Sequence, residues 1–132
     1  MRRTRFRAWH TEEKKMYSDP LINGLTGEVC IYDQGEITGV YDIETVIPLQ
    51  YTGLKDRNGT EIYEGDIINI CSKGSCNPAK VVFDNEDQKG CFCVIGYLGD
   101  LRTYPIKDFV DCEIEVIGNI HENPDLIERS QT

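Results

Sequence analysis

Hydrophobic and polar residues alternate in short segments along most of the chain, and turn-forming residues separate these segments. Residues 4–9 alternate, with Phe6 and Ala8 on one side. Residues 15–17 would return antiparallel after the polar turn at 10–14. Because alternation with a period of two is typical of a half-buried strand, the beginning of the chain predicts a β-hairpin.

The same pattern recurs at spacings near ten residues, which is typical of a small β-barrel or β-sandwich. We expect a glycine-, serine- and proline-bearing loop at 72–78 and a charged turn at 84–90. Pro48 cannot donate a ladder hydrogen bond, so it belongs at the beginning of a strand or on a sheet edge. The further strand candidates are 28–32, 36–41, 46–54, 67–70, 79–83, 91–97 and 113–117.

Two local signals add detail to this β pattern. Asn58-Gly59 predicts a two-residue type I′ turn, because that turn requires a positive φ at both central positions. Tyr51 and Tyr63 would then lie on neighbouring strands. At the other end, Asn123 is a good N-cap and Pro124 suits the first helical position, which predicts a short C-terminal helix and tail over 124–132.

The charge of the chain is unevenly distributed. The 132 residues carry a net charge of −9, yet residues 1–15 hold six Arg or Lys against two Glu. Such an acidic body repels a phosphate backbone, which disfavours ordinary nucleic-acid binding. The basic arm is interpreted either as a solubilising, edge-protecting cluster or as a working basic contact. The acidic body could also occupy a basic groove of a partner.

The beginning of the chain also bears on location. Four arginines among the first seven residues leave no room for the apolar segment of a secretory signal. No apolar stretch approaches the roughly 20 residues of a membrane span. We therefore expect a cytoplasmic protein without a membrane contact.

An even count of six cysteines suggests either a metal site or disulfides. Their spacing fits zinc poorly, because a zinc site usually pairs its ligands as Cys-x2-Cys. Cys91 and Cys93 would point to one face of a strand, where reduced cysteine acts as a small apolar filler. Packing is therefore the favoured interpretation, a four-cysteine metal site and a redox role stay open, and no cofactor is expected. The cysteines are Cys30, Cys71, Cys76, Cys91, Cys93 and Cys112.

Candidate catalytic groups are few. His10 and His121 stand near the ends without a motif around them, so we expect surface or turn positions for both. Glu64 and Asp66 could bind a metal or act as an acid–base pair, but Gly65-Asp66 at a strand entrance favours a turn in which Asp66 accepts backbone donors. No catalytic or metal residue is therefore predicted.

Aromatic residues offer the remaining candidate site. Large aromatics either pack in the core, which we favour here, or act as binding hot spots. If Trp9 lay beside Arg7 on an open face, the pair would form a recognition patch. The candidate interaction patch consists of Arg5, Arg7, Trp9, Tyr51 and Tyr63.

Three blocks give the chain a family resemblance: Phe6-Arg7-Ala8-Trp9 with Lys15-Met16, then 50–66, then 116–124. The second block reads QYTGLKDRNGTEIYEGD and the third reads VIGNIHENP. Together they resemble the YopX family of phage and prophage proteins. The sequence departs from the family at His10, where an acidic residue often follows the tryptophan, and the cysteines lie outside the shared blocks.

This resemblance implies a mainly β protein with an N-terminal β-hairpin region, an SH3-like small β-barrel in the C-terminal half and a short C-terminal helix. The expected regions are 1–60, 61–123 and 124–132. The resemblance implies a phage or prophage in a bacterial host and brings no biochemical activity with it.

Two functions follow from these observations. The first is a non-enzymatic phage accessory protein that acts as a protein-interaction module in the host cytoplasm, with an unknown protein partner and homo-oligomerisation left open. The alternative is a nucleic-acid-associated factor that uses the basic N-terminal arm.

Overall fold

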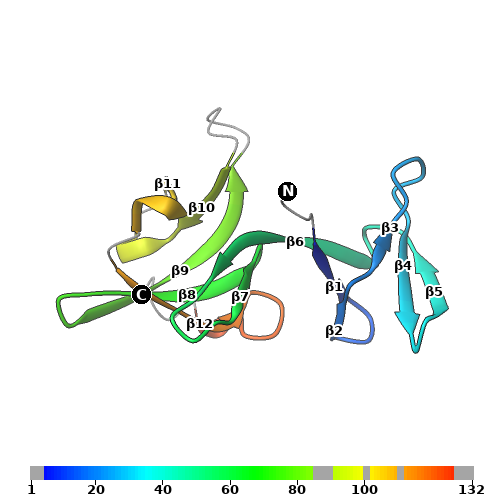
Figure 1. Cartoon of the computed structure of the whole chain (residues 1–132), viewed down its shortest axis with the longest axis horizontal. Helices are drawn as coiled ribbons and strands as arrows, with labels where there is room; N and C mark the ends of the chain where they lie inside the picture. The colour runs from blue at the N-terminus through cyan, green and yellow to red at the C-terminus, as the bar shows by residue number, and fades with distance from the viewer. Residues whose placement is uncertain (1–4, 85–90, 100–101, 110–111, 127–132) are drawn as a thin grey trace. The chain divides into compact units, whose positions relative to one another are not determined.

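The protein is built almost entirely of β-strands. The computed structural model describes residues 5–84, 91–99, 102–109 and 112–126 (Figure 1). No helix within these ranges is long and apolar enough to cross a membrane. The strands are β1 (Phe6–His10), β2 (Lys15–Ser18), β3 (Leu21–Ile22), β4 (Val29–Asp33), β5 (Glu36–Tyr41), β6 (Val46–Lys55), β7 (Glu61–Tyr63), β8 (Asp66–Ser72), β9 (Ser75–Asp84), β10 (Cys91–Ile95), β11 (Thr103–Pro105) and β12 (Glu113–Asn119), with 3-10 helices η1 (Tyr97–Gly99) and η2 (Ile106–Phe109). The predicted mainly β class is confirmed.

The chain forms two compact units, Met1–Tyr51 and Thr52–Thr132. In the first unit, β1 pairs with β2 in the predicted hairpin and with the first half of β6, while β3, β4 and β5 form a separate antiparallel sheet. Its core joins the two sheets: Ala8, Val29, Ile31 and Val46 are buried together, with Tyr17 and Tyr41 packed against them.

The second unit is a curled, half-barrel sheet of five antiparallel strands in the order β11-β10-β9-β8-β12 (Figure 1). The inner faces of its strands carry apolar side chains, which pack together into one core. That core consists of Ile62, Ile68, Ile70, Ala79, Val81, Val94 and Ile106.

Strand β6 contributes to both units. Its residues Val46–Gln50 pair with β1, and β7 is its hydrogen-bonded neighbour on the other side. Pro48 lies in the part that pairs with β1 alone, so its missing N–H costs no ladder bond. Pro48 is the third residue of β6, so the position predicted near the beginning of a strand is confirmed.

Strand β9 accommodates its proline in the same way, and this corrects the loop predicted at 72–78. Pro78 lies opposite Asn69 of β8, whereas the pairing of β9 with β10 runs only from Lys80 to Asp84. The proline therefore sits where β9 has a partner on one side. The predicted loop shrinks to Lys73-Gly74, two residues with φ of +51° and +84° that close a hairpin between Ser72 and Ser75.

The turn at Asn58-Gly59 exists, but the type predicted for it is wrong. Gly59 has a φ of +84°, whereas Asn58 does not have a positive φ. The amide of Gly59 donates to the carbonyl of Asp56 at 3.0 Å, and the amide of Asp56 donates to the carbonyl of Thr60 at 2.8 Å. This is a type I turn followed by a glycine in the left-handed region.

The side chain of Asp56 explains that choice of turn. Its Oδ1 accepts hydrogen bonds from the amides of Asn58 and Thr60 at 2.8 and 2.9 Å. Its Oδ2 accepts one from the amide of Val116, in β12, at 2.9 Å. Because Asp56 is only 8% exposed, these three donors replace water around a carboxylate. One side chain thus shapes the loop and attaches it to a strand 60 residues later.

At the C-terminus, Asn119 organises the end of β12. Its Oδ1 accepts hydrogen bonds from the amides of His121 and Glu122 at 3.0 and 2.8 Å. The Asn123 side chain accepts one from the amide of Asn119 at 3.3 Å. Asp125 and Leu126 are helical, but the rest of the helix predicted over 124–132, like most of the charged turn at 84–90, lies outside the described residues.

Replacing Asp56 with alanine should lower the free energy of unfolding by about 3 kcal/mol, because three buried amides lose a charged acceptor. Urea denaturation measures this loss. Arg57→Gln is the matched control: the ion pair of Arg57 with Glu113 is half exposed on the arginine side, so its loss should cost less than about 1 kcal/mol. Equal losses in the two variants would contradict the role given to Asp56.

Acidification tests the same carboxylate. Burial raises the pKa of Asp56, but the amides of Val116, Thr60 and Asn58 outweigh it, so the pKa lies below the ordinary value of 3.8. The contribution of Asp56 to stability is therefore complete above that value and is lost as the pH falls through the lower pKa of the folded state. The stability difference between the wild type and Asp56→Asn should shrink over this range, as measured by denaturation at several pH values. A constant difference would contradict the assignment.

Candidate functional site

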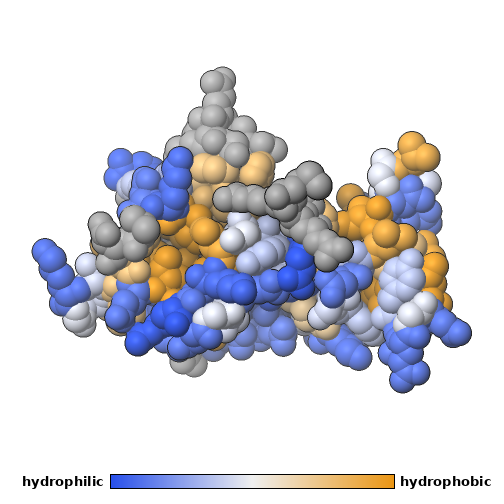
Figure 2. All heavy atoms as spheres, in the orientation of Figure 1, coloured by the Kyte–Doolittle hydropathy of each residue, from blue (hydrophilic) through white to orange (hydrophobic). Residues whose placement is uncertain are grey.

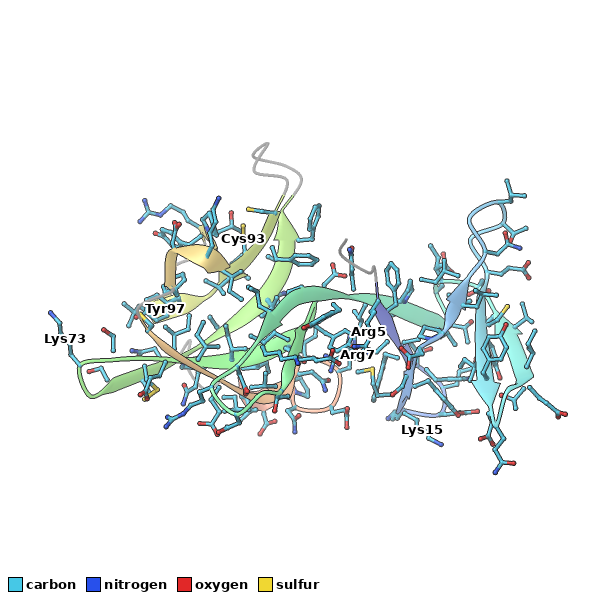
Figure 3. All side chains as sticks on the ribbon, in the orientation of Figure 1. Arg5, Arg7, Lys15, Lys73, Cys93 and Tyr97 are labelled. Carbon is cyan, nitrogen blue, oxygen red and sulfur yellow. A yellow bond between two sulfur atoms is a disulfide. The ribbon has the colours of Figure 1, made fainter. Side chains whose placement is uncertain are left out.

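The structure brings some residues of the predicted interaction patch together and buries others. Arg5 lies against Tyr51, with its Cζ 5.7 Å from the ring centroid, and forms a 3.7 Å ion pair with Asp19. Trp9 is buried at 7% exposure. Arg7 is half-buried on the same strand (Figure 3). Tyr63 is buried and belongs to the second unit. Whether this set binds a partner stays a prediction.

His10 is not at the surface, which corrects the position predicted for it. It is 3% exposed, and its ring packs edge-on against Tyr41 at a centroid distance of 4.7 Å. Its Nδ1 accepts the amide of Glu13 at 3.2 Å, and its Nε2 lies 3.6 Å from the Glu13 carboxylate. The imidazole therefore holds the β1–β2 turn against the β4–β5 hairpin.

Residues of the two hairpins line a pocket of about 410 Å³ within the first unit. Three tyrosines, two carboxylates and one lysine converge on it. The lining residues are Glu13, Lys15 and Tyr17 from the first hairpin and Ile31, Tyr32, Asp33, Thr38 and Tyr41 from the second. We regard this pocket as the strongest candidate binding site, because convergent polar groups in a concave surface are the usual mark of one.

The pocket has a distinct electrostatic character. The Tyr17 hydroxyl donates a hydrogen bond to the Glu13 carboxylate. This bond, followed by burial and by the negative charges of Glu13 and Asp33, raises the pKa of Tyr17 to about 12. The Lys15 ammonium lies over the Tyr17 ring, 4.8 Å from its centroid. Negative charge is thus disfavoured in the pocket and positive charge is favoured.

Beside the pocket, the β3–β5 sheet exposes an apolar face. Leu21, Cys30 and Val40 stand directly opposite one another across the three strands, and Tyr32 stands opposite Ile37. Residues directly opposite share one face of a sheet. Leu21, Ile37 and Val40 are 54%, 54% and 50% exposed, and Figure 2 shows hydrophobic atoms gathered over these strands. We call these five residues the apolar face.

An apolar solvent-facing surface is unusual for an antiparallel sheet, whose outer side is commonly polar. The charged residues in this part of the sequence are also all of one sign. Residues 16–54 contain six acidic residues and no Lys, Arg or His. The sequence shows this lack of basic residues, but a division of the charge into a basic arm and an acidic body does not reveal it. The acidic residues are Asp19, Glu28, Asp33, Glu36, Asp42 and Glu44.

The second unit contains a groove of about 440 Å³ that is mainly apolar. Basic side chains from Lys55, Arg57 and Lys107 lie along it. Ile62 and Ile106 of the core form part of its wall, so it opens directly onto the apolar interior. The other lining residues are Leu54, Asp56, Phe109, Cys112, Glu113 and Ile114.

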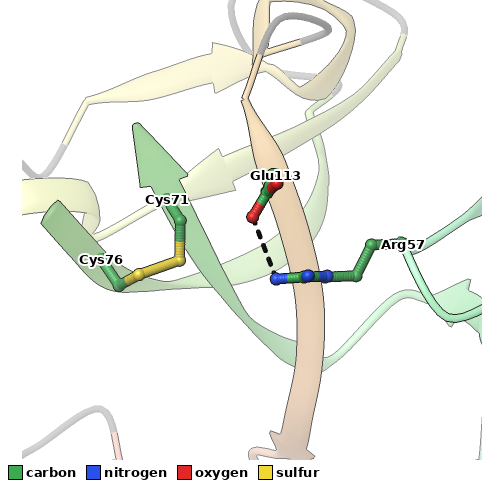
Figure 4. The surroundings of a disulfide bond; sticks show 4 residues. All are labelled: Arg57, Cys71, Cys76 and Glu113. Carbon is green, nitrogen blue, oxygen red and sulfur yellow. Dashed lines mark hydrogen bonds and ion pairs between the residues drawn. A yellow bond between two sulfur atoms is a disulfide. The ribbon is translucent and has the colours of Figure 1, made fainter. Parts of the chain in front are cut away.

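The cysteines differ from the prediction in one pair. Cys71 and Cys76 face each other across the β8–β9 hairpin with Cα atoms 4.0 Å apart, and they form a disulfide (Figure 4). The packing interpretation favoured for the cysteines is therefore wrong for this pair, because the two-residue turn brings the sulfurs together. Cys91 and Cys93 do share a face, with sulfurs 3.8 Å apart, and Cys93 is buried (Figure 3).

The positions of the His, Cys, Asp and Glu side chains bear on the metal and acid–base interpretations. Across the described ranges, no three side chains of His, Cys, Asp or Glu group closely enough to hold a metal ion. Asp66 is 1% exposed, and its Oδ2 accepts the amide of Tyr63 at 2.8 Å. The predicted turn role of Asp66 is confirmed.

The fold and the pocket define a small, two-unit β protein with a concave tyrosine- and carboxylate-lined site. The sequence model of the YopX protein family matches residues 5–128, so the chain belongs to the YopX family. A comparison with curated proteins gave no match.

Two solved structures are similar to the chain over nearly its whole length. Protein EF1440 from Enterococcus faecalis is 28% identical with a TM-score of 0.66, and the match covers 96% of this chain and 99% of that one. Protein yopX from Bacillus subtilis is 23% identical with a TM-score of 0.62, and the match covers 92% and 96%. The second likeness concerns the fold alone.

Reduction of the Cys71–Cys76 disulfide should lower the free energy of unfolding by about 2 kcal/mol, the loop-closure value for so short a loop. The hairpin should remain paired, because its ladder runs from Ile67 to Ser72 on β8. Denaturation with and without dithiothreitol measures the loss, and Cys71→Ser with Cys76→Ser should remove the response. A response that persists in this double variant would contradict the assigned bond.

Proposed function

We propose that this YopX-family protein is a non-enzymatic protein-interaction module encoded by a phage or prophage. In this proposal the first unit binds a basic, apolar segment of a partner protein. The curled sheet of the second unit would be an SH3-like small barrel that serves as scaffold. The site of action would be the cytoplasm of the bacterial host.

The apolar face, within a stretch whose charged residues are all acidic, is the observation that carries the proposal. Fully burying a Leu, Ile or Val side chain contributes about 1.5–3 kcal/mol, so covering three half-exposed ones offers a few kcal/mol to a complex. The acidic residues around the face would repel acidic competitors and attract a basic partner. Charge complementarity also argues against a second copy of this chain as the occupant, since its own net charge is −9.

The non-enzymatic part of the proposal is supported by the environment of the histidines. His10 is enclosed by Glu13 and Tyr41, where it joins two hairpins. His121 donates its backbone amide to Asn119 in the turn after β12. Both residues thus have structural explanations. The alternative nucleic-acid function relies on the basic arm, of which residues 1–4 lie outside the described residues.

Affinity capture from the bacterial host, followed by binding assays with the purified captured protein, tests the proposal. Leu21→Ser with Val40→Ser should weaken binding at least tenfold, because the apolar contact is lost. Leu98→Asn is the matched control, since Leu98 is 68% exposed but belongs to the second unit. Binding should also weaken with salt and map to a basic segment of the partner.

Three outcomes would contradict this proposal. Equal binding by the face variant and the control variant would place the contact elsewhere. Self-association that the face variant abolishes would make a second copy the occupant. Salt-dependent retention of DNA or RNA that disappears when residues 1–7 are deleted would favour the nucleic-acid function.

A further inference from the structure

We propose that the pocket between the two hairpins of the first unit binds one cationic side chain, an arginine or lysine, of the partner protein. This inference rests on the proposed function and names the group that the basic segment supplies. Tyr32 belongs both to the pocket and to the apolar face. A single segment can therefore lay apolar residues on the face while one charged side chain enters the pocket.

The aromatic walls suit a cation. Tyr17 from the first hairpin and Tyr32 and Tyr41 from the second line the same cavity. The face of an aromatic ring carries partial negative charge and attracts a guanidinium or ammonium group within about 6 Å of its centroid. A pocket of this kind selects charge and planarity together, which favours arginine.

The carboxylates add a direct partner. Glu13 is already engaged by the Tyr17 hydroxyl and lies near His10. Asp33 also lines the pocket, and within the described part of the chain its carboxylate has no ion pair. An entering guanidinium would find in Asp33 an acceptor for charge-assisted hydrogen bonds.

The chain supplies its own example of a bound cation. Lys15 lines the pocket, and its ammonium lies over the Tyr17 ring. Two carboxylates and one ammonium leave the pocket with a surplus of one negative charge. Lys15 also competes with an incoming cation, so its removal should tighten binding.

Gly39 fixes the shape of the pocket through Tyr41. A Cβ at Gly39 would overlap the ring of Tyr41, so a larger residue there would force that ring to move away from its place over β5. The φ of Gly39 is not in the left-handed region, so its requirement is space rather than backbone conformation. Gly39 is thus a positioning residue for the aromatic wall.

The pKa of the Tyr17 hydroxyl is a separate indication that the electrostatic potential in the pocket is negative. This pKa is raised to about 12, first by the hydrogen bond to Glu13 and further by burial and nearby negative charge, including that of Asp33. A cation in the pocket would oppose this effect.

Titration of the full chain with Nα-acetyl-arginine amide, followed by NMR, tests the inference. Signals of the pocket tyrosines should shift in a saturable way, and the neutral isostere Nα-acetyl-citrulline amide should not produce these shifts. Asp33→Asn should weaken binding about tenfold, close to the 1.4 kcal/mol of one charged contact. Lys15→Gln should strengthen it, and Gly39→Ala should weaken it.

Glu36→Gln is the matched control. Glu36 stands opposite Asp33 in the same hairpin but does not line the pocket, and both substitutions remove one negative charge. Equal weakening by Asp33→Asn and Glu36→Gln would reduce the effect to general electrostatics and overturn the inference. Equal shifts with the citrulline amide, or no saturable shift with the arginine amide, would overturn it as well.

The apolar-face variant separates this inference from the proposed function. Leu21→Ser with Val40→Ser should keep binding of the arginine amide while losing the captured partner. If the amide fails to bind but the partner still depends on the apolar face, the inference is wrong and the proposed function stands. If the arginine amide binds but the apolar-face variant binds the partner as tightly as the wild type does, the proposed function is wrong and the cation site stands.

Discussion

The carboxylate of Asp56 joins local and distant structure in the second unit. It accepts the amides of Asn58 and Thr60 within its own turn and the amide of Val116 in β12. The adjoining backbone adds a bond from the Arg57 amide to the Ile114 carbonyl at 2.9 Å. Because a buried carboxylate is stable only when donors surround it, the turn, the β6–β7 hairpin and β12 must form together. The core beneath them, including Ile62, closes on this framework.

The second constraint on the fold is that two long strands change their pairing partner along their length. Strands β6 and β9 are ten residues long, and in each the proline lies in a part that has a single partner. A proline in a doubly paired part would remove a ladder bond. The two prolines are therefore compatible with long strands that exchange one neighbour for another along their length. The first part of β9 can therefore pair with β8 in a hairpin, and its last part can pair with β10.

The first unit combines a polar pocket with an exposed apolar face. His10 and Tyr41 hold its two hairpins together from beneath, and Gly39 leaves room for the tyrosine ring. The pocket and the apolar face meet at Tyr32, so the polar cavity and the apolar surface are continuous. The charged residues of 16–54 are all acidic, and Lys15 adds one positive charge at the pocket.

The sequence by itself determined the mainly β class, the first hairpin, most strand positions and the family, because these depend on period-two alternation, turn residues and short motifs. It also carried the turn role of Asp66. The tertiary structure alone decided the turn type at Asn58, the extent of β9, the burial of His10 and the pairing of Cys71 with Cys76. The burial of His10 depends on a distant hairpin, whereas the turn type and the disulfide depend on side-chain contacts that only the folded turns and hairpins create. Only folding brings Glu13 and Asp33 to one cavity, since no local pattern encodes the approach of two separate hairpins.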